Sequence, residues 1–387
     1  MKHRDHTLDF VRGLSALLVM LGHLRGFVFF DLGELESPSI ATKAFYFATG
    51  LGHQAVMVFF VLSGYFVGGS VLSGLAKRHF TWGGYAAARL TRLWMVLLPA
   101  LLLTLAIDLL GHSSNPEAYA GAFKDRFMSG PSSAQPAAHD LVTFFGNMGF
   151  LQTVMLPVYG SNGPLWSLAN EFWYYVLFPL LVVPLWRMIG SEERTTNSRW
   201  GVGGLSLVFF GVIVLWLPRP LVISGLIWLM GAVVWWCLWK VKGQIIEPWV
   251  PSGRMHRGWW GLGILGAGLF VGSLVASKTG HWLGSDYAVG IAFAIWLLSL
   301  PGTWRMPPLL GKMVTGLSEI SYTLYVVHFP LLFFVAAVVL KGRQFPADAM
   351  GFLLFGGLTA AVLLISGAMW WLFERNTAWL RSRICKR

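Results

Sequence analysis

Apolar runs of roughly 20 residues dominate the chain, and short charged connections separate most of them. A run of this length is what an α-helix needs to cross the hydrocarbon core of a bilayer. The pattern therefore predicts an all-α, polytopic membrane helix bundle of about ten transmembrane helices. The expected spans lie near residues 7–30, 50–72, 85–111, 165–189, 202–217, 219–240, 258–277, 283–301, 319–340 and 349–374. The fifth and sixth meet at "LPRP" (217–220) and could instead form a hairpin of two short helices.

Composition and charge agree with this class of protein. The 387 residues are 56% hydrophobic and only 12% charged, far from an ordinary soluble domain. The formal net charge of +12 comes from Lys and Arg in the short connections, not from a basic run interleaved with aromatics, so we expect no nucleic-acid partner. Two cysteines form neither a disulfide framework nor a CxxC motif, and no metal is expected.

The positive charges also predict an orientation. With the N-terminus inside, most of the 29 Lys and Arg residues fall on the cytoplasmic side, as the positive-inside rule requires. Both termini are then cytoplasmic, and the first apolar run is an uncleaved helix, because it lacks a small-x-small cleavage site. The one long connection, 112–164, is extracytoplasmic. We expect a single integral-membrane domain over residues 1–387.

The first apolar run carries Arg12 at one end and His23 at the other. A separation of eleven residues is roughly three helical turns, so the two side chains share a face about 16 Å apart along the axis. Asp9 precedes Arg12 by one turn and can pair with it. Ionisable groups at membrane depth are functional hypotheses by default. The plainer alternatives are an interfacial anchor for Arg12 and a packing histidine at His23.

Two other spans carry charges of interest. Arg89 and Arg92 stand at i, i+3 near the cytoplasmic end of the third span, where two guanidiniums suit a phosphate-bearing ligand, or simply anchor the helix. Glu171 lies about six residues into a span that enters from outside, about 9 Å deep. This depth is close to that of His23, so the two could meet. The alternative is a Glu171 paired with another helix.

Two stretches indicate helix packing. His328 lies in "SEISYTLYVVHFPLL" (318–332), where serine, tyrosine and histidine favour hydrogen bonds between helices over chemistry. Ser63 and Gly64, in the second span, are small enough to allow a second helix to approach closely.

Six motifs in order resemble the membrane-bound acyltransferase family usually called acyltransferase 3. They are "LDFVRGLSALLVMLGH" (8–23), "VFFVLSGYF" (58–66), "ARLTRLWMVLLP" (88–99), "LWSLANEFWYYVLFP" (165–179), "ISYTLYVVHFP" (320–330) and "FERN" (373–376). Met57 stands where the family often has Asp, and Asn376 replaces its usual Pro. The resemblance spans nearly the whole chain.

This resemblance implies an O-acyltransferase that moves an acyl group, expected to be acetyl, from cytoplasmic acyl-CoA to a hydroxyl of an extracytoplasmic glycan. Arg12 and His23 carry over as the active-site pair, and Glu171 as a functional carboxylate. Arg89 and Arg92 carry over as contacts to the acyl-CoA, of which acetyl-CoA is the expected form. The expected location is the lipid bilayer of a bacterial inner membrane.

Several alternatives stay open. His23 could act as general base or carry the acyl group covalently. A separate extracytoplasmic partner could complete the transfer, because no soluble esterase-like domain follows the last span, and a homo-oligomer is compatible with the sequence. The rival functions are a transporter or flippase of a sugar-linked lipid, and a structural partner in a polysaccharide export complex.

Overall fold

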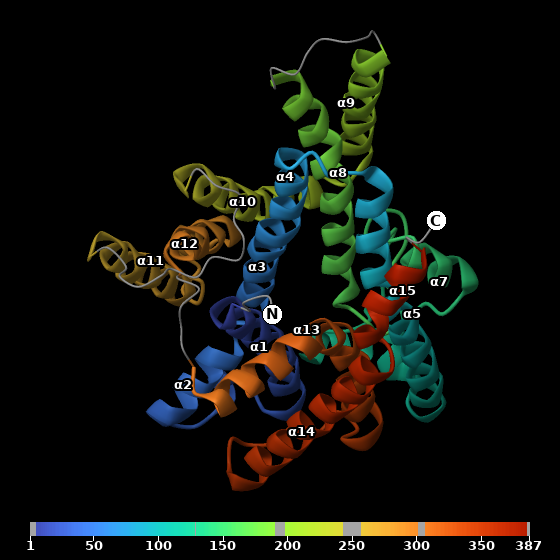
Figure 1. Ribbon diagram of the computed structural model, residues 1–387. Helices are drawn as coiled ribbons and strands as arrows, with labels where there is room; N and C mark the ends of the chain where they lie inside the picture. The colour runs from blue at the N-terminus through green and yellow to red at the C-terminus, as the bar shows by residue number, and fades with distance from the viewer. Residues whose placement is uncertain (1–4, 128, 190–197, 243–256, 301–305, 385–387) are drawn as a thin grey trace. The chain divides into compact units, whose positions relative to one another are not determined.

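The computed structural model describes residues 5–127, 129–189, 198–242, 257–300 and 306–384, and the regular elements in these parts are helices. In chain order they are α1 (His6–Val28), α2 (Ile40–Thr49), α3 (Gly52–Ser63), α4 (Gly69–Ala76), α5 (Trp82–Ser114), α6 (Phe123–Phe127), α7 (Leu141–Met148), α8 (Leu165–Ile189), α9 (Ser198–Trp216), α10 (Arg219–Lys242), α11 (Arg257–Ala276), α12 (Asp286–Ser299), α13 (Pro308–Phe334), α14 (Ala349–Leu372) and α15 (Thr377–Ile384) (Figure 1). This confirms the predicted all-α class.

The helices are those of a polytopic membrane protein. Among the described residues, 7 helical segments are long and apolar enough to cross a membrane. They are His6–Val28, Gly52–Ala76, Trp82–Ser114, Leu165–Met188, Arg219–Lys240, Pro308–Val339 and Ala349–Arg383. Shorter apolar helices at Gly203–Trp216, Gly261–Ala276 and Asp286–Ser299 coincide with the other expected spans. The count of ten complete crossings and the cytoplasmic termini stay predictions.

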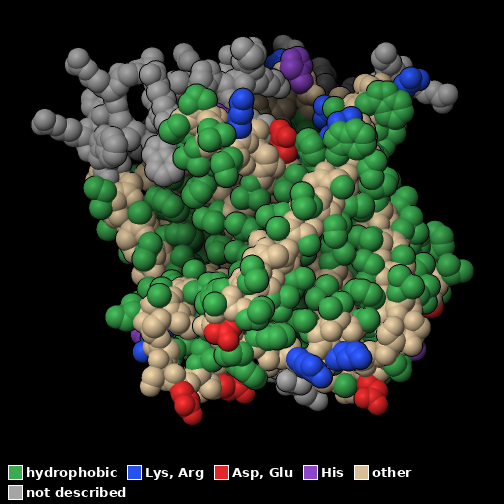
Figure 2. Space-filling model, turned by 90° about the horizontal axis from the view of Figure 1, so that it is seen from below, with side chains coloured by type: hydrophobic (Ala, Val, Ile, Leu, Met, Phe, Trp, Pro, Cys, Tyr) green, Lys and Arg blue, Asp and Glu red, His purple; other side chains and the backbone are tan. Residues whose placement is uncertain are grey.

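Most of the surface seen in Figure 2 is hydrophobic. Many large apolar side chains on the long helices are more than half exposed, among them Leu102, Leu110, Leu215, Ile264 and Leu364. Exposure of these apolar side chains to water would be unfavourable in free energy, whereas contact with lipid tails carries no such penalty. The exposure therefore fits a bundle that faces a bilayer.

The described chain packs into two compact units, each made of segments that are discontinuous in sequence. The first comprises Met57–Ala86 and Leu168–Pro301, and the second comprises Arg4–Val56, Ala87–Ser167 and Gly302–Arg387. The prediction of a single acyltransferase domain stays a prediction.

In the first unit, α10 packs tightly against the junction of α3 and α4. A single π-helical turn, Gly64–Gly68, forms this junction. A Cβ atom on Gly64 would lie 1.8 Å from the Trp228 carbonyl oxygen, and a Cβ on Gly231 would lie 1.8 Å from the Val61 carbonyl oxygen. Only glycine permits this reciprocal backbone contact, which confirms the close approach expected at Gly64.

In the second unit, α1 and α13 lie side by side along much of their length (Figure 1). A Cβ on Gly13 would be 3.1 Å from the backbone nitrogen of Ser318, so the helices are close at this end. Further along, Met20, Leu24 and Phe27 of α1 are fully buried. This pairing brings together the first and the late sequence motif.

Candidate functional site

His23 and His328 contact each other across the α1–α13 interface. His23 Nδ1 lies 3.0 Å from His328 Nε2, and the rings are stacked with centroids 5.2 Å apart. His328 Nδ1 in turn lies 2.9 Å from the Leu324 carbonyl oxygen, one turn earlier in α13. The interhelical hydrogen bond predicted for His328 is present, and its partner is the candidate active-site histidine.

The histidine pair has both apolar and polar neighbours. Phe329 presents its ring edge-on to His23 at a centroid distance of 4.9 Å. The Tyr325 ring also contacts His328, and the Tyr325 hydroxyl is 2.5 Å from Ser167 Oγ. His328 is fully buried, whereas His23 is half-buried. His23 is therefore the member of the pair that a ligand can reach.

Arg12 and Arg92 converge electrostatically on Glu374, a residue of the closing "FERN" motif. Both guanidiniums interact favourably with the Glu374 carboxylate. The Thr323 hydroxyl of α13 donates a 2.6 Å hydrogen bond to Glu374 Oε2 and holds that carboxylate in place. The structure thus brings together two of the predicted arginines, from α1 and α5, around an acidic residue that the sequence did not single out as a site residue.

Arg89 and Arg92 lie on one continuous helix, α5, as their spacing predicted. Arg92 is exposed and Arg89 is half-buried. Arg12 and His23 likewise share the unbroken helix α1, so their separation of about 16 Å along the axis follows directly from helix geometry. Whether these arginines hold a phosphate-bearing ligand stays a prediction.

Glu171 lies in the first unit, at the centre of a polar cluster. The Ser63 hydroxyl of α3 donates a 2.5 Å hydrogen bond to Glu171 Oε1, and the Tyr175 hydroxyl donates to the same oxygen. Trp228 Nε1 donates to Ser63 Oγ at 3.1 Å and fixes the hydroxyl. Glu171 therefore has one partner on another helix, Ser63 of α3, and one on its own helix, Tyr175. Since His23 belongs to the second unit, the expected approach of the two residues stays a prediction.

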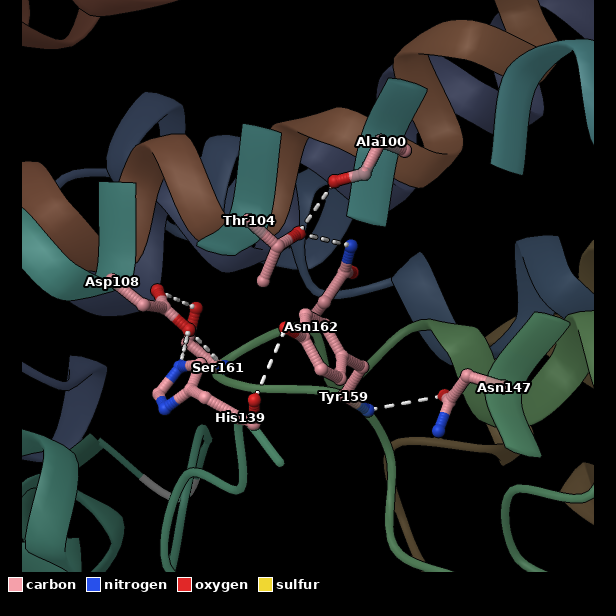
Figure 3. Close-up of polar contacts among 8 residues, drawn as sticks. All are labelled: Ala100, Thr104, Asp108, His139, Asn147, Tyr159, Ser161 and Asn162. Carbon is pink, nitrogen blue, oxygen red and sulfur yellow. Dashed lines mark hydrogen bonds and ion pairs between the residues drawn. The ribbon is translucent and has the colours of Figure 1, made fainter. Parts of the chain in front are cut away.

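A separate cluster fastens the predicted extracytoplasmic segment 112–164 to the end of α5 (Figure 3). The fully buried Asp108 carboxylate accepts a 2.7 Å hydrogen bond from Ser161 Oγ and a 2.6 Å bond from the Ser161 backbone nitrogen. His139 Nε2 lies 2.9 Å from Asp108 Oδ2. The Asp108 carboxylate thus joins two distant parts of one loop to a membrane helix.

Serine, histidine and aspartate do not form a nucleophilic triad here. In such a triad the histidine lies between the other two and takes the proton of the serine. Here the Ser161 hydroxyl donates to Asp108 and not to His139 (Figure 3). The neighbouring Asn162 amide nitrogen donates to Thr104 Oγ1 and to the Val326 carbonyl, at 3.2 and 2.9 Å. The cluster is structural, and it ties the segment to both α5 and α13.

Sequence reasoning missed Asp108 and Glu374 as site residues, although each leaves a signal in the sequence. Asp108 is an isolated acid in an otherwise apolar stretch of the third span, and Glu374 follows directly on the apolar stretch of the last span. Ionisable groups inside or at the edge of an apolar run must find partners.

Among the described residues, the structure shows no group of three or more His, Cys, Asp or Glu side chains placed to hold a metal ion.

The fold and these buried ionisable clusters define a polytopic membrane protein with paired polar groups inside its helix bundle. A model of the acyltransferase 3 family, described as an acyltransferase domain, matches residues 5–371. The chain belongs to this family.

A second comparison finds a partial likeness. The chain is 24% identical over 132 residues to a multidrug efflux pump, SdrM, from Staphylococcus aureus (strain N315). The match covers 32% of this chain and 29% of the pump. No solved structure matches the chain.

Proposed function

We propose that the protein transfers an acetyl group from cytoplasmic acetyl-CoA to a hydroxyl of an extracytoplasmic carbohydrate, in a bacterial inner membrane. The observation that carries this proposal is the arrangement along α1. One end of the helix carries Arg12, which shares Glu374 with Arg92, and the other end carries a half-buried histidine. Membership of the acyltransferase 3 family supports acyl transfer as the reaction, and these residues suggest its mechanism.

The arginine end suits the donor. Arg12 and Arg92 both interact favourably with the Glu374 carboxylate, and their guanidiniums are candidates to bind an anion such as the phosphates of acyl-CoA. Arg89, one helical turn from Arg92 on α5, is a third candidate contact. A pantetheine arm extended from these arginines would cover the offset of about 16 Å to His23.

At the other end, His23 would act as general base on the acceptor hydroxyl. As the hydroxyl oxygen attacks the thioester carbonyl, its proton passes to the imidazole, and the carbon–sulfur bond breaks. The departing thiolate then takes this proton from the imidazolium, which yields the ester and the free CoA thiol. In the covalent alternative the imidazole attacks the thioester carbonyl, the carbon–sulfur bond breaks, and the CoA thiolate leaves with the imidazole proton; the acceptor hydroxyl then attacks the acyl-imidazole, the carbon–nitrogen bond breaks, and the hydroxyl proton returns to the freed imidazole. Glu171 would orient the acceptor or compensate charge.

The direct test is thiol release from acetyl-CoA by the purified protein in detergent or nanodiscs, with and without glycan acceptors. We expect acceptor-dependent release that falls about 10²- to 10⁴-fold in His23→Gln, because glutamine keeps a hydrogen-bonding group but cannot take a proton at neutral pH. His79→Gln, a change at an exposed histidine, is the control. Near wild-type release by well-folded His23→Gln protein would make His23 structural.

The rival proposal is a transporter, for which the partial likeness to an efflux pump is the specific observation. That likeness covers about a third of the chain, whereas the acyltransferase match covers residues 5–371. A transporter would move a sugar-linked lipid across proteoliposomes without consuming a thioester. Movement of such a lipid with no thiol release and no product ester would favour it.

A further inference from the structure

The hydrogen bonds at the histidine pair identify which ring nitrogens carry hydrogen. A carbonyl oxygen can only accept a hydrogen bond, so His328 Nδ1, 2.9 Å from the Leu324 carbonyl oxygen, must be protonated. A neutral imidazole has one protonated nitrogen, and the other bears a lone pair. In neutral His328 the lone pair is therefore on Nε2, the atom that faces His23.

The alternative, a doubly protonated His328, would place a positive charge in a fully buried site. The groups around it are the His23 ring, the edges of Tyr325 and Phe329, and the Leu324 carbonyl. Among the described residues, no carboxylate forms a hydrogen bond or ion pair with His328. A buried charge without such a partner is very costly, so His328 is neutral.

The hydrogen in the 3.0 Å contact between the rings must then come from His23. We infer that the contact with His328 holds His23 as its Nδ1–H tautomer and leaves the lone pair on His23 Nε2, which makes Nε2 the atom that takes the hydroxyl proton and His328 a positioning residue. The part of this inference that concerns catalysis rests on the proposed function. The tautomer itself follows from the geometry alone.

This arrangement has a chemical consequence for the transfer step. When His23 Nε2 takes the proton, the new imidazolium keeps its Nδ1–H bond to the His328 lone pair. That bond strengthens because its donor is now charged. His328 in turn is held by the Leu324 carbonyl. Both rings therefore keep their orientation while the proton moves from the acceptor hydroxyl to His23 Nε2 and later to the leaving thiolate. In the covalent route, the lone pair on His23 Nε2 would be the nucleophile.

Two substitutions at His328 separate positioning from packing. In His328→Gln the side-chain oxygen can reach the former Nε2 position and accept from His23 Nδ1, so we expect the acyl-transfer kcat of folded protein to stay within about tenfold of wild type. In His328→Leu no acceptor remains, and the wrong tautomer becomes available to His23. Loss of tautomer control in a Ser-His-Asp triad costs about 10⁴-fold. We expect a kcat loss of about 10²- to 10⁴-fold with unchanged KM for acetyl-CoA.

His79→Leu is the matched control, because it removes an exposed histidine in the other unit. Thermal stability of every variant is measured beside kcat. An unchanged kcat in folded His328→Leu protein would overturn the positioning role. Equal kcat losses in the glutamine and leucine variants would also overturn it, since acceptance of the His23 hydrogen would then not matter.

The tautomer is measured directly in the wild-type protein, so the test does not depend on a variant that folds. Histidine labelled with ¹⁵N distinguishes protonated from unprotonated ring nitrogens, and the signals absent from His23→Gln belong to His23. We expect protonated Nδ1 and unprotonated Nε2. A protonated Nε2 at His23 overturns the inference even if acyl transfer is confirmed. The expected tautomer without any acyl transfer would instead refute the proposed function and leave the assignment intact.

Discussion

Removal of the Asp108 carboxylate is expected to release the segment 112–164 from the membrane helices. Asp108 is fully buried and accepts bonds from the Ser161 hydroxyl, the Ser161 backbone nitrogen and His139 Nε2. In Asp108→Ala all three donors lose their acceptor. Loss of one partner of a buried, charged hydrogen-bonded group costs about 3–5 kcal/mol. Since 1.4 kcal/mol is about tenfold in an equilibrium, the open population of this segment should rise by about 10²- to 10³-fold or more.

Asp108→Asn provides a graded comparison. The amide oxygen can still accept from the Ser161 backbone nitrogen and from His139, and the amide nitrogen can donate to the Ser161 hydroxyl oxygen. The bonds remain but lose their charge, and neutral bonds are about half as strong. We expect a smaller release than in the alanine variant.

The assay is limited proteolysis of detergent-solubilised protein, followed by mass spectrometry of fragments from residues 129–164. When opening is fast relative to cleavage, the cleavage rate reports the open population. Asp140→Ala is the control on the same segment, since its exposed carboxylate caps α7 and water can replace it there. Cleavage rates in the two Asp108 variants that match wild type would refute the fastening role.

Three further predictions concern the donor, the topology and the packing. Arg92→Ala should raise the KM for acetyl-CoA about 10- to 100-fold, because a charged hydrogen bond contributes about 1.5–3 kcal/mol. Arg92→Lys should restore part of the donor affinity, since it keeps the charge. An unchanged donor KM would indicate that Arg92 only anchors the helix. In a cysteine-free background, Ser133→Cys should react with an impermeant thiol reagent outside intact cells and Lys77→Cys should not; the reverse result would contradict the orientation. Gly64→Ala should lower the melting temperature, since its Cβ would lie 1.8 Å from a carbonyl oxygen. Gly204→Ala, which meets nothing within 4 Å, should not; equal melting temperatures would contradict the close packing.

The helices could be predicted from the sequence because they depend on local properties. The span expected at 165–189 coincides with α8, and the span expected at 219–240 begins with α10. Each is an apolar run of membrane-crossing length, and no distant residue is needed to recognise it. The α5 helix extends to Ser114, beyond the expected end at 111, because the polar residues at its end can still continue a helix.

The contacts of the site could not be predicted in the same way, because they join residues far apart in the chain. His23 and His328 are 305 positions apart, and Asp108 is 53 positions from Ser161. Helical periodicity assigns each side chain to a face and a depth, but it does not determine which helix covers that face. The sequence therefore predicts a hydrogen bond from His328 to another helix, but it does not identify His23 as the partner.

Two acidic residues, Glu374 in the second unit and Glu171 in the first, differ in what surrounds them. The Glu374 carboxylate interacts favourably with the guanidiniums of Arg12 and Arg92, and this attraction offsets their mutual repulsion. Glu171 is held by the hydroxyls of Ser63 and Tyr175 instead, which stabilise a carboxylate without cancelling its charge. The Glu374 carboxylate therefore has cationic neighbours, whereas the Glu171 carboxylate is stabilised by neutral hydroxyl donors.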